Sequence, residues 1–284
     1  MKEYNINDLY VVIVVYNTSC QDSISYNRAK DSSVKIIVCD NSTSDYGNEE
    51  IVKNDGNIYI NMGGNNGLSK AYNAAIQVIN KDNRYICLFD DDTDMGKKYF
   101  DKVLSYINMS NADILLPVVK TSTRILSPCQ FKKKRCVEVK NLEELINKPI
   151  SAINSGMVIK SEIYKDYKYN ENIFLDYLDH DFMREMNKDK KNILVMNDNV
   201  LKQDFSMESN SLEASYKRLC ILNHDLKEYY KEDYIMYLYQ ILAYKLVMIK
   251  KYKSLKFVLL KKFKQEVWYE KVYIGFGYKD YSKN

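Results

Sequence analysis

The chain has 284 residues and a mass of 33.4 kDa, which is enough for one large hydrophobic core with a smaller appendage. Hydrophobic residues make up 46% of it and charged residues 28%, proportions that exclude wholesale disorder and a protein with many membrane spans. The net charge of +4 is too mild to indicate nucleic-acid binding. We therefore expect a globular protein with one main domain.

The cysteines and the N-terminus predict a cytoplasmic protein. The six cysteines include no C-x-x-C pair, and Cys39 and Cys87 lie inside apolar runs, so we expect reduced, buried thiols. Residues 1–9 carry charges and asparagines where a signal peptide would have an uninterrupted apolar stretch. No export is predicted.

Short β-branched runs alternate with helical patterns in the first half of the chain, which predicts a parallel sheet covered by helices. The predicted strands are residues 9–16, 34–39, 57–60 and 85–89. The polar residues that follow them are Asn17, Asp40, Asn41, Ser42, Asn61 and Asp90. Ligands bind beyond the carboxyl ends of such strands, so these residues predict a site at one edge of the sheet. A polar residue after any single strand is commonplace, but four such strands favour a site.

A glycine-rich loop lies between the third and fourth predicted strands. Gly63, Gly64 and Gly67 fall within residues 61–70, and a helix is expected over residues 68–80. Glycine allows close approach of the backbone, and the helix that follows offers free N–H groups to an anion. The loop is therefore a candidate wall for a nucleotide or diphosphate, with a plain turn as the alternative.

Three consecutive aspartates, Asp90, Asp91 and Asp92, follow the fourth strand directly. In an extended segment, alternate residues face the same side, so Asp90 and Asp92 form one pair. Carboxylates without a nearby histidine or cysteine pair favour Mg²⁺ or Mn²⁺. A solvated acidic turn or a helix cap is the alternative interpretation, and the strand before the triplet favours the metal site.

A second acidic segment contains Asp176, Asp179 and Asp181. Asp176 and Asp179 are spaced to share a helical face, and one carboxylate here is a candidate general base. Capping of the next helix is the simpler alternative. Upstream, Asn154, Ser155 and Gly156 form a turn of small residues before an apolar strand, which we expect to admit an acceptor.

With these motifs, the chain resembles glycosyltransferase family 2, the inverting enzymes of the Rossmann-like A-type fold, and in particular its rhamnosyltransferase-like and galactofuranosyltransferase-like branches. The matching pieces span about residues 9–185 in the expected order: VVIVVYN, Asp40-Asn41-Ser42, NMGGNNGLSKAYNAA, LFDDDT, INSGMVI and FLDYLDHDF. The resemblance implies an α/β fold with a mixed, mainly parallel sheet. We expect a catalytic domain over residues 1–210 and a basic helical extension over 211–284.

The resemblance also implies roles for individual residues. Those assigned to the donor nucleotide are Tyr16, Asn17, Asp40, Asn41, Ser42, Asn66, Gly67, Lys70, Asp90 and Asp91. Asp90 and Asp92 correspond to the D-x-D motif that holds Mn²⁺ or Mg²⁺, with Asp92 as the direct ligand. Asp179 matches the catalytic base, and Asp181 is the second candidate.

The implied reaction transfers a sugar from a nucleoside-diphosphate donor to a glycan or lipid-linked acceptor in cell-surface polysaccharide synthesis. Deoxythymidine-diphosphate (dTDP) rhamnose and a uridine-diphosphate (UDP) sugar, galactofuranose or another hexose, are both candidate donors. A sugar nucleotidyltransferase is an alternative, but it needs a glycine-rich basic loop where residues 17–19 read Asn-Thr-Ser. The remaining alternative is a cation-binding or glycan-binding module without catalytic activity.

The last third of the chain changes character. From about residue 212 the pattern predicts helices, and residues 234–265 contain eight lysines and no acidic residue. Such a stretch either lies on the anionic cytoplasmic face of a membrane or packs on the core as a helical subdomain with a basic face. Polar residues interrupt it too often for a spanning helix.

Overall fold

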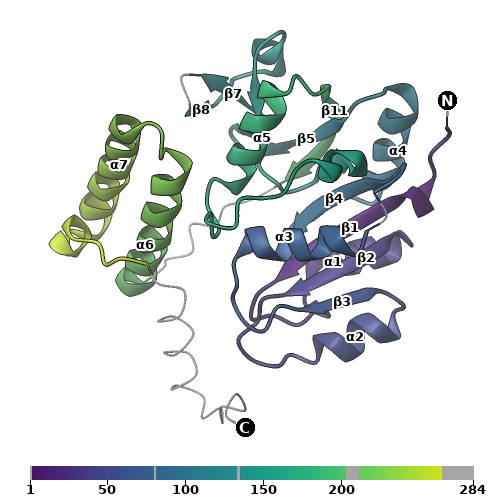
Figure 1. Cartoon of the computed structure of the whole chain (residues 1–284), viewed down its shortest axis with the longest axis horizontal. Helices are drawn as coiled ribbons and strands as arrows, with labels where there is room; N and C mark the ends of the chain where they lie inside the picture. The colour runs from purple at the N-terminus through teal and green to yellow at the C-terminus, as the bar shows by residue number, and fades with distance from the viewer. Residues whose placement is uncertain (1, 80, 133–134, 203–210, 264–284) are drawn as a thin grey trace.

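The computed structural model of the chain describes residues 2–79, 81–132, 135–202 and 211–263. A mixed sheet of eight strands forms the centre (Figure 1), in the order β11-β5-β10-β4-β1-β2-β3, with β6 paired to β5. Its strands are β1 (Leu9–Val15), β2 (Lys35–Asp40), β3 (Ile58–Asn61), β4 (Tyr85–Asp90), β5 (Ile114–Lys120), β6 (Ile125–Ser127), β10 (Met157–Lys160) and β11 (Ile193–Lys202). A second sheet joins β7 (Cys129–Lys132), β8 (Arg135–Val137) and β9 (Ile150–Ser151).

The four strands expected from the sequence lie side by side. β1 pairs in parallel with β2 and β4, and β2 pairs in parallel with β3. β10 runs antiparallel between β4 and β5, and β11 is parallel to β5. The prediction of a mixed, mainly parallel sheet is confirmed. The predicted bounds need one correction, because Asp40, Asn61 and Asp90 are the last residues of their strands rather than the first residues of loops.

Helices cover both faces of the sheet. They are α1 (Ile24–Asp31), α2 (Asn48–Asn54), α3 (Leu68–Gln77), α4 (Tyr99–Met109) and α5 (Leu178–Lys188). Leu9, Val11 and Ile13 of β1 pack in one core cluster with residues of α1, α2 and α4, whereas Tyr10 and Val12 pack in another with residues of α3 and α5. Burial on both faces explains why β1 is an uninterrupted apolar run. Short 3₁₀ turns occupy η1 (Ile6–Asp8), η2 (Leu142–Leu145) and η3 (Ser161–Lys165).

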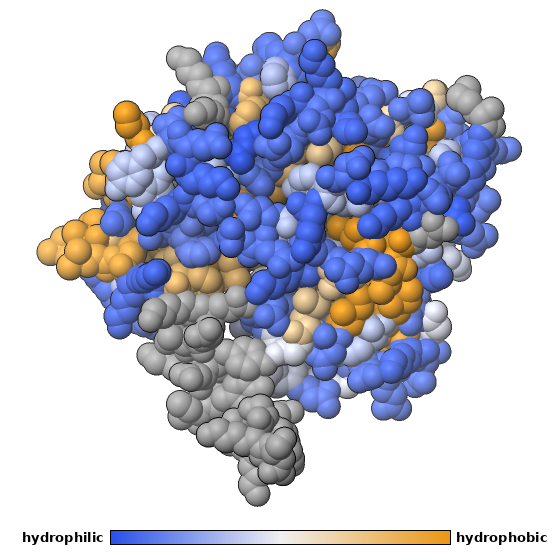
Figure 2. Space-filling model, viewed as in Figure 1, coloured by the Kyte–Doolittle hydropathy of each residue, from blue (hydrophilic) through white to orange (hydrophobic). Residues whose placement is uncertain are grey.

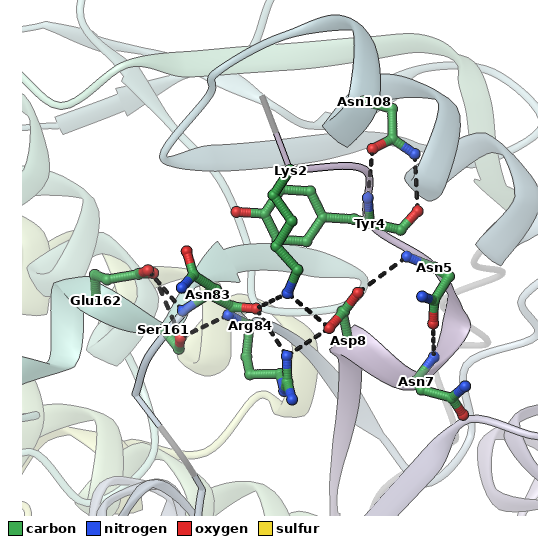
Figure 3. Close-up of polar contacts among 10 residues, drawn as sticks. All are labelled: Lys2, Tyr4, Asn5, Asn7, Asp8, Asn83, Arg84, Asn108, Ser161 and Glu162. Carbon is green, nitrogen blue, oxygen red and sulfur yellow. Dashed lines mark hydrogen bonds and ion pairs between the residues drawn. The ribbon is translucent and has the colours of Figure 1, made fainter.

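A polar cluster ties the amino ends of β1 and β4 together (Figure 3). Asp8, which immediately precedes β1, accepts hydrogen bonds from Lys2 at 2.8 Å and from Arg84, which precedes β4, at 2.5 Å. Tyr4 and Asn108 exchange two hydrogen bonds of 2.8 and 2.9 Å. These contacts occupy the end of the sheet at which β1 and β4 begin. The polar residues gather at the other end, where the parallel strands finish.

After residue 211 the chain forms a helical hairpin beside the sheet (Figure 1), made of α6 (Leu212–Tyr229), α7 (Tyr234–Tyr252) and the 3₁₀ turn η4 (Leu255–Val258). The three elements share a small core that includes Tyr216, Leu219, Ile241 and Phe257. The predicted domain boundary falls beside residues 203–210, which lie outside the described residues, as do residues 264–284 of the predicted extension. Among the described helices, none combines the length and apolar character needed to cross a membrane.

One buried carboxylate attaches this hairpin to the rest of the molecule. Asp225 of α6 is 0% exposed and accepts three backbone hydrogen bonds of 2.8 Å, from the N–H groups of Phe174, Leu175 and Asp176. The three donors are consecutive residues of the segment that leads into α5 and its acidic residues. The position of this segment therefore depends on the hairpin.

Replacing Asp225 should destabilise the protein. The substitution Asp225→Asn keeps the shape but turns one acceptor oxygen toward the N–H groups into a donor, so we expect unfolding free energy to fall by about 2–4 kcal/mol. The matched substitution Glu213→Gln, on the exposed face of the same helix, should cost much less, because its ion pair with Lys256 is exposed to solvent. Urea unfolding of the two variants measures the difference, and equal losses would contradict the role assigned to Asp225.

Candidate active site

The polar strand ends meet at one edge of the sheet. Val14 of β1 pairs with Asp90 of β4, Val15 pairs with Asp40 of β2, and Asp40 pairs with Asn61 of β3. Neighbouring strands are roughly 4.8 Å apart, so the ends of β4 and β2 lie roughly 10 Å from each other. The convergence predicted from the sequence is confirmed.

Two serines of the α1 region hold the backbone of the acidic turn. Ser23 Oγ donates to the carbonyl of Asp91 at 2.7 Å. Ser25 Oγ lies 2.5 Å from the carbonyl of Asp90 and 3.0 Å from that of Thr93, and it accepts from the Thr93 N–H at 3.1 Å. The turn is therefore fixed through its main chain, which leaves the carboxylates free to bind a ligand. Sequence analysis missed both serines, since their contacts are long-range.

Asp90 and Asp92 lie close enough for their charges to interact, and their role as a ligand pair stays a prediction. Asp90 Oδ2 accepts a hydrogen bond of 2.8 Å from Ser155 Oγ, while the side chain of Asp92 is exposed. Burial raises the pKa of Asp90, and the nearby carboxylates of Asp92 and Asp179 raise it further. The charged form of Asp90 is thus costly without a cation, and the acidic segment before α5 lies close to it.

The acidic segment after β4 also contains Asp91 and Asp94. Burial and the charges of Asp92 and Asp90 raise the pKa of Asp91 to about 6. Asp94, beyond the triplet, forms an ion pair of 3.0 Å with Arg28 of α1. Asp94 therefore belongs to the surface.

The pair fits a hard divalent cation. Asp90 and Asp92 offer carboxylate oxygens at the end of a rigid strand, and burial, followed by the nearby carboxylates, raises the pKa of Asp90. In the part of the chain that the structure describes, no three His, Cys, Asp or Glu side chains are grouped as a metal site. Two protein carboxylates suit Mg²⁺ or Mn²⁺ when the remaining ligands are water and phosphate.

A cavity of about 560 Å³ opens at the ends of β2 and β3. Its wall includes Asp40, whose carboxylate accepts from the Ser42 N–H at 2.8 Å, the Asn48 amide at 2.9 Å and the Tyr59 hydroxyl at 3.1 Å. These three donors fix Asp40 in place at the cavity wall. Asp40 and Ser42, both assigned to the donor nucleotide, line this cavity, together with Asn61, Gly63 and Gly64.

Tyr16 and Asn17 lie beside this cavity at the end of β1. The Tyr16 side chain is 48% exposed, so its ring is available to a planar group. Asn17 has a φ of 52°, its N–H donates to Ser42 Oγ at 2.9 Å, and its side-chain oxygen accepts from the Thr43 N–H at 2.9 Å. The two loops that follow β1 and β2 are therefore tied together.

The glycine loop contacts two other segments, the loop after β2 and the segment that leads into α5. The Asn66 N–H donates to Asn41 Oδ1 at 3.3 Å, and the Asn41 amide donates to the Gly67 carbonyl at 3.2 Å. Gly67 has a φ of +85°, and a Cβ there would lie 2.7 Å from both the ring and the carbonyl oxygen of Phe174. The Leu68 N–H, at the start of α3, donates to that same carbonyl at 2.7 Å. One helix N–H is thus already bound to the protein.

Lys70 of α3 is not among the residues that line the cavity at Asp40. It contributes to lowering the pKa of Glu171, after the larger effects of Lys168 and Asn73, so it lies near that carboxylate. The structure therefore places Lys70 beside Glu171, and its contact with a donor stays a prediction.

The turn of small residues reaches Asp90, a contact that the sequence did not predict, and its role in acceptor binding stays a prediction. Ser155 donates to Asp90, and Asn154 Oδ1 is buried without a hydrogen-bond partner among the described residues. Gly156 has a φ of +76°; its N–H donates to the Leu88 carbonyl at 2.8 Å, and its carbonyl accepts from the Tyr99 hydroxyl at 2.6 Å. This turn is anchored to β4 and α4, with one unsatisfied oxygen left at Asn154.

Asp179 is the aspartate of the second segment that lies close to the metal pair. It raises the pKa of Asp90, and it lines a cavity of about 410 Å³ between the start of α5 and the helical hairpin. His180 Nδ1 lies 3.9 Å from Asp179 Oδ1 and 2.8 Å from Ser151 Oγ. Burial disfavours the charged imidazole, but Asp179 and a hydrogen bond with Cys136 raise the pKa of His180 to about 9. Asp179 therefore has a positively charged neighbour.

The structure does not bring Asp181 to this place. Asp181 forms an ion pair with Arg184, one helical turn away, and lines a separate cavity with Tyr167 and Tyr229. Asp181, the second candidate base, is not among the charges that shift the pKa of Asp90, whereas Asp179 is. The helix turns the two side chains apart, a rotation that the sequence alone could not fix.

The expected helical pairing of Asp176 with Asp179 is wrong. α5 begins only at Leu178, after Tyr177 with a φ of 65°, so Asp176 precedes the helix. Arg218 of α6 donates to both carboxylate oxygens of Asp176. Asp176 is therefore a link between the acidic segment and the hairpin.

Tyr72 of α3 is a residue of the site that sequence analysis missed. Its side chain is fully buried, and its hydroxyl has no hydrogen-bond partner within the described residues. Its pKa is raised by burial and then by Asp90 and Asp179, so the hydroxyl lies near both carboxylates. In the sequence, a tyrosine on an apolar helix face looks like an ordinary core residue. An unsatisfied hydroxyl between two carboxylates instead indicates a place for a ligand.

Comparisons with known proteins agree with this geometry. The family model described as glycosyl transferase family 2 matches residues 10–167. The dTDP-rhamnosyl transferase RfbF of Shigella flexneri is 26% identical over 180 residues, which are 61% of this chain and 61% of that protein. The chain thus spans about three fifths of this curated relative, 61% of its length.

Solved structures show the same fold. A crystal structure of S. aureus TarS 1–349 in complex with UDP has a TM-score of 0.52 at 16% identity, over 77% of this chain and 65% of that one. GalNAc-T7 with UDP, GalNAc and Mn²⁺ has a TM-score of 0.55 at 11% identity, over 75% of this chain and 47% of that one. At such identities the likeness carries the fold alone, and it confirms the Rossmann-like A-type fold.

Cation binding should depend on pH. The raised pKa values of Asp90 and Asp91 mean that the folded protein holds more protons than the unfolded chain between pH of about 4 and 6. Without a cation, unfolding free energy should fall as pH rises through this window. Because Mn²⁺ binds the ionised carboxylates, it should raise the melting temperature more at pH 8 than at pH 5. Asp92→Asn should abolish the difference and Asp94→Asn should not; an equal Mn²⁺ shift at both pH values would contradict the site.

Gly67 should tolerate no side chain. Gly67→Ala combines a strained φ with overlap against Phe174, whereas Gly63→Ala meets the same kind of φ, +70°, with nothing within 4 Å. We expect Gly63→Ala to cost about 1–2 kcal/mol and Gly67→Ala about 1–3 kcal/mol more. Thermal unfolding of both variants tests this, and similar losses would show that the loop is not pressed against Phe174.

Proposed function

Because the chain belongs to glycosyl transferase family 2, whose model matches more than half of its length, we propose that it is a metal-dependent, inverting glycosyltransferase. The observation that carries the proposal is the proximity of Asp179 to Asp90, which pairs a candidate base with a candidate metal site. A cavity at the ends of β2 and β3 lies on one side of this pair, and the cavity beside Asp179 lies on the other.

The donor lies along the carboxyl ends of the strands. Its base and ribose occupy the cavity at Asp40, with the ring of Tyr16 at the cavity's edge. Its diphosphate lies at Asp90 and Asp92, roughly 10 Å away, a separation that one nucleoside bridges. Asp90 and Asp92 would hold a divalent cation, which would supply positive charge to offset the charge that develops on the leaving diphosphate.

Asp179 acts as the general base. Its carboxylate takes the proton of an acceptor hydroxyl, and the oxygen of that hydroxyl forms a bond to the anomeric carbon. The bond from that carbon to the diphosphate oxygen breaks on the opposite face, and the nucleoside diphosphate leaves with the electron pair. One displacement inverts the anomeric centre without a covalent enzyme intermediate. Tyr72 and Ser155 position the reacting groups around Asp90.

The preferred donor is dTDP-rhamnose. The support is the 26% identical relative, which is named for that donor, over 61% of its own length. A UDP sugar, galactofuranose or another hexose, is the other candidate. Thermal-shift measurements with dTDP and UDP, each with Mn²⁺, distinguish them, because only the matching base should fit beside Asp40.

The acceptor enters from the hairpin side. The cavity beside Asp179 has an apolar wall of Leu219, Leu222 and Met248, and its charged residues include Arg218 and Lys251. Such a lining suits a glycan or a lipid-linked acceptor in cell-surface polysaccharide synthesis. All six cysteines are free thiols, which supports a cytoplasmic location where nucleotide sugars are used.

Two alternatives give different results in the same assay. A sugar nucleotidyltransferase would release pyrophosphate from a nucleoside triphosphate and a sugar phosphate. A module without catalytic activity would bind a cation or glycan and turn over nothing. Release of dTDP or UDP from a nucleotide sugar in the presence of Mn²⁺ excludes both.

The two candidate bases should separate in a transfer assay. We expect Asp179→Asn to lower kcat for transfer by about 10²–10⁴-fold, because the base is lost while the cavity keeps its shape. Nucleoside-diphosphate binding should persist in this variant. Asp181→Asn, normalised to the folded fraction, should keep transfer within a few-fold of the parent protein, roughly the scale of a group outside the reaction. Near-normal transfer by Asp179→Asn with an inactive Asp181→Asn would move the base to Asp181.

A further inference from the structure

One side of α7 packs on α6, and the other side is an exposed apolar row. Tyr237, Ile241, Tyr244 and Met248 pack in the core that α7 shares with α6. The exposed row recurs every three or four residues, so it forms one stripe along the helix. We define the α7 outer face as Ile235, Leu238, Tyr239, Leu242, Leu246 and Val247, each between 45% and 81% exposed.

The apolar surface continues past the end of α7. Leu255 is 78% exposed, Val258 is 47% exposed and Leu259 is 82% exposed. Figure 2 shows hydrophobic residues gathered at the left edge of the molecule, over the end of α7 and the segment that follows it. So many large apolar side chains on one surface exceed the scattered exposure that is normal for a protein in water.

Lysines surround the far end of this surface. The exposed ones are Lys250, Lys251, Lys253, Lys256, Lys261 and Lys262. Between residues 234 and 263 the chain has no acidic residue. Of these lysines, Lys256 forms an ion pair with Glu213 of α6. The surface thus combines an apolar stripe with a concentration of positive charge.

We propose that the α7 outer face and the segment through Leu259 dock on an anionic lipid bilayer, with α7 in the plane of the interface. Apolar side chains enter the boundary between headgroups and acyl chains, and lysines contact anionic headgroups. A second copy of the chain fits this surface less well. If two copies met through it, their lysines would repel each other, and residues 234–263 provide no acidic side chain to pair with them. Packing of the inner face against α6 keeps the helix flat on the surface.

Docking places the cavity beside Asp179 near the headgroups. Tyr244, Met248 and Lys251 of α7 line that cavity, and Lys251 also belongs to the lysine group of the docking surface. The head of an acceptor carried by a lipid would then extend past α7 to reach Asp179 while its lipid stays in the bilayer. This step rests on the proposed function, whereas binding to the bilayer does not.

Vesicle co-sedimentation of the full chain, without donor, tests the docking. We expect binding to vesicles of phosphatidylcholine with phosphatidylglycerol and much less to phosphatidylcholine alone. The double substitution Leu242→Gln and Leu246→Gln should weaken binding by about tenfold or more, because two apolar side chains no longer leave water. Lys250→Gln with Lys253→Gln should weaken binding to the mixed vesicles by about fivefold per lysine.

Matched controls lie on other surfaces. Met109→Gln removes an apolar side chain that is 83% exposed on α4, and Lys148→Gln removes an exposed lysine; both should bind as the parent does.

Absence of binding to mixed vesicles, or equal losses in the controls, would overturn the proposal. So would a dimer in light scattering that dissociates in the double leucine variant, since a second copy would then occupy the surface. The variant Leu246→Cys tests whether the chain covers this surface itself. If the protein is a monomer and this thiol does not react with maleimide in the absence of vesicles, another part of the same chain covers the surface, and the proposal is wrong.

Because the vesicle assay contains no donor, its outcome is independent of catalysis. If the protein hydrolyses the donor but does not bind vesicles, the docking proposal is wrong and the proposed function stands. Normal vesicle binding without donor hydrolysis in the presence of Mn²⁺ would sink the proposed function alone.

Discussion

The arrangement of the site depends on the carboxylate of Asp225. It is buried in α6 and satisfies three consecutive backbone N–H groups of the segment that leads to Asp179. The Phe174 carbonyl, in the same segment, accepts the N–H of Leu68 at the start of α3. The hairpin, the acidic segment and the glycine loop are therefore connected in series, first by the Asp225 carboxylate and then by a main-chain hydrogen bond. The segment that precedes the candidate base Asp179 is thus held from two sides, by α6 and by the start of α3.

The second constraint is electrostatic. Asp90 is half-buried close to Asp92 and Asp179, and the Tyr72 hydroxyl nearby has no partner in the described part of the chain. Such a cluster is unfavourable by itself at neutral pH, since its charges repel each other away from water. A cation or a bound substrate removes that penalty. The groups that the resting protein satisfies least well are those that the proposed reaction uses.

The sequence predicted the sheet and its polar edge because both depend on local patterns. Buried parallel strands are recognisable as apolar runs, and Asp40 and Asp90 stand where those runs end. Asp225 was not predictable, because it is 51 positions from Phe174 and looks like any acid on a helix. The choice between Asp179 and Asp181 depends on the rotation of α5 about its axis. The helical character of the extension was predicted, but which side of α7 is covered depends on where α6 lies.

The reversed direction of β10 has a further consequence. Its start carries Ser155 to the carboxylate of Asp90, and Ser161, just after its end, bonds to Arg84 at the opposite edge of the sheet. The chain from Ser155 to Ser161, with β10 at its centre, thus runs beside β4 from one end to the other. Adding or removing one residue within Met157–Lys160 would flip the alternate side chains and break both attachments at once. A change in chain length should therefore be tolerated better in the loops outside this strand.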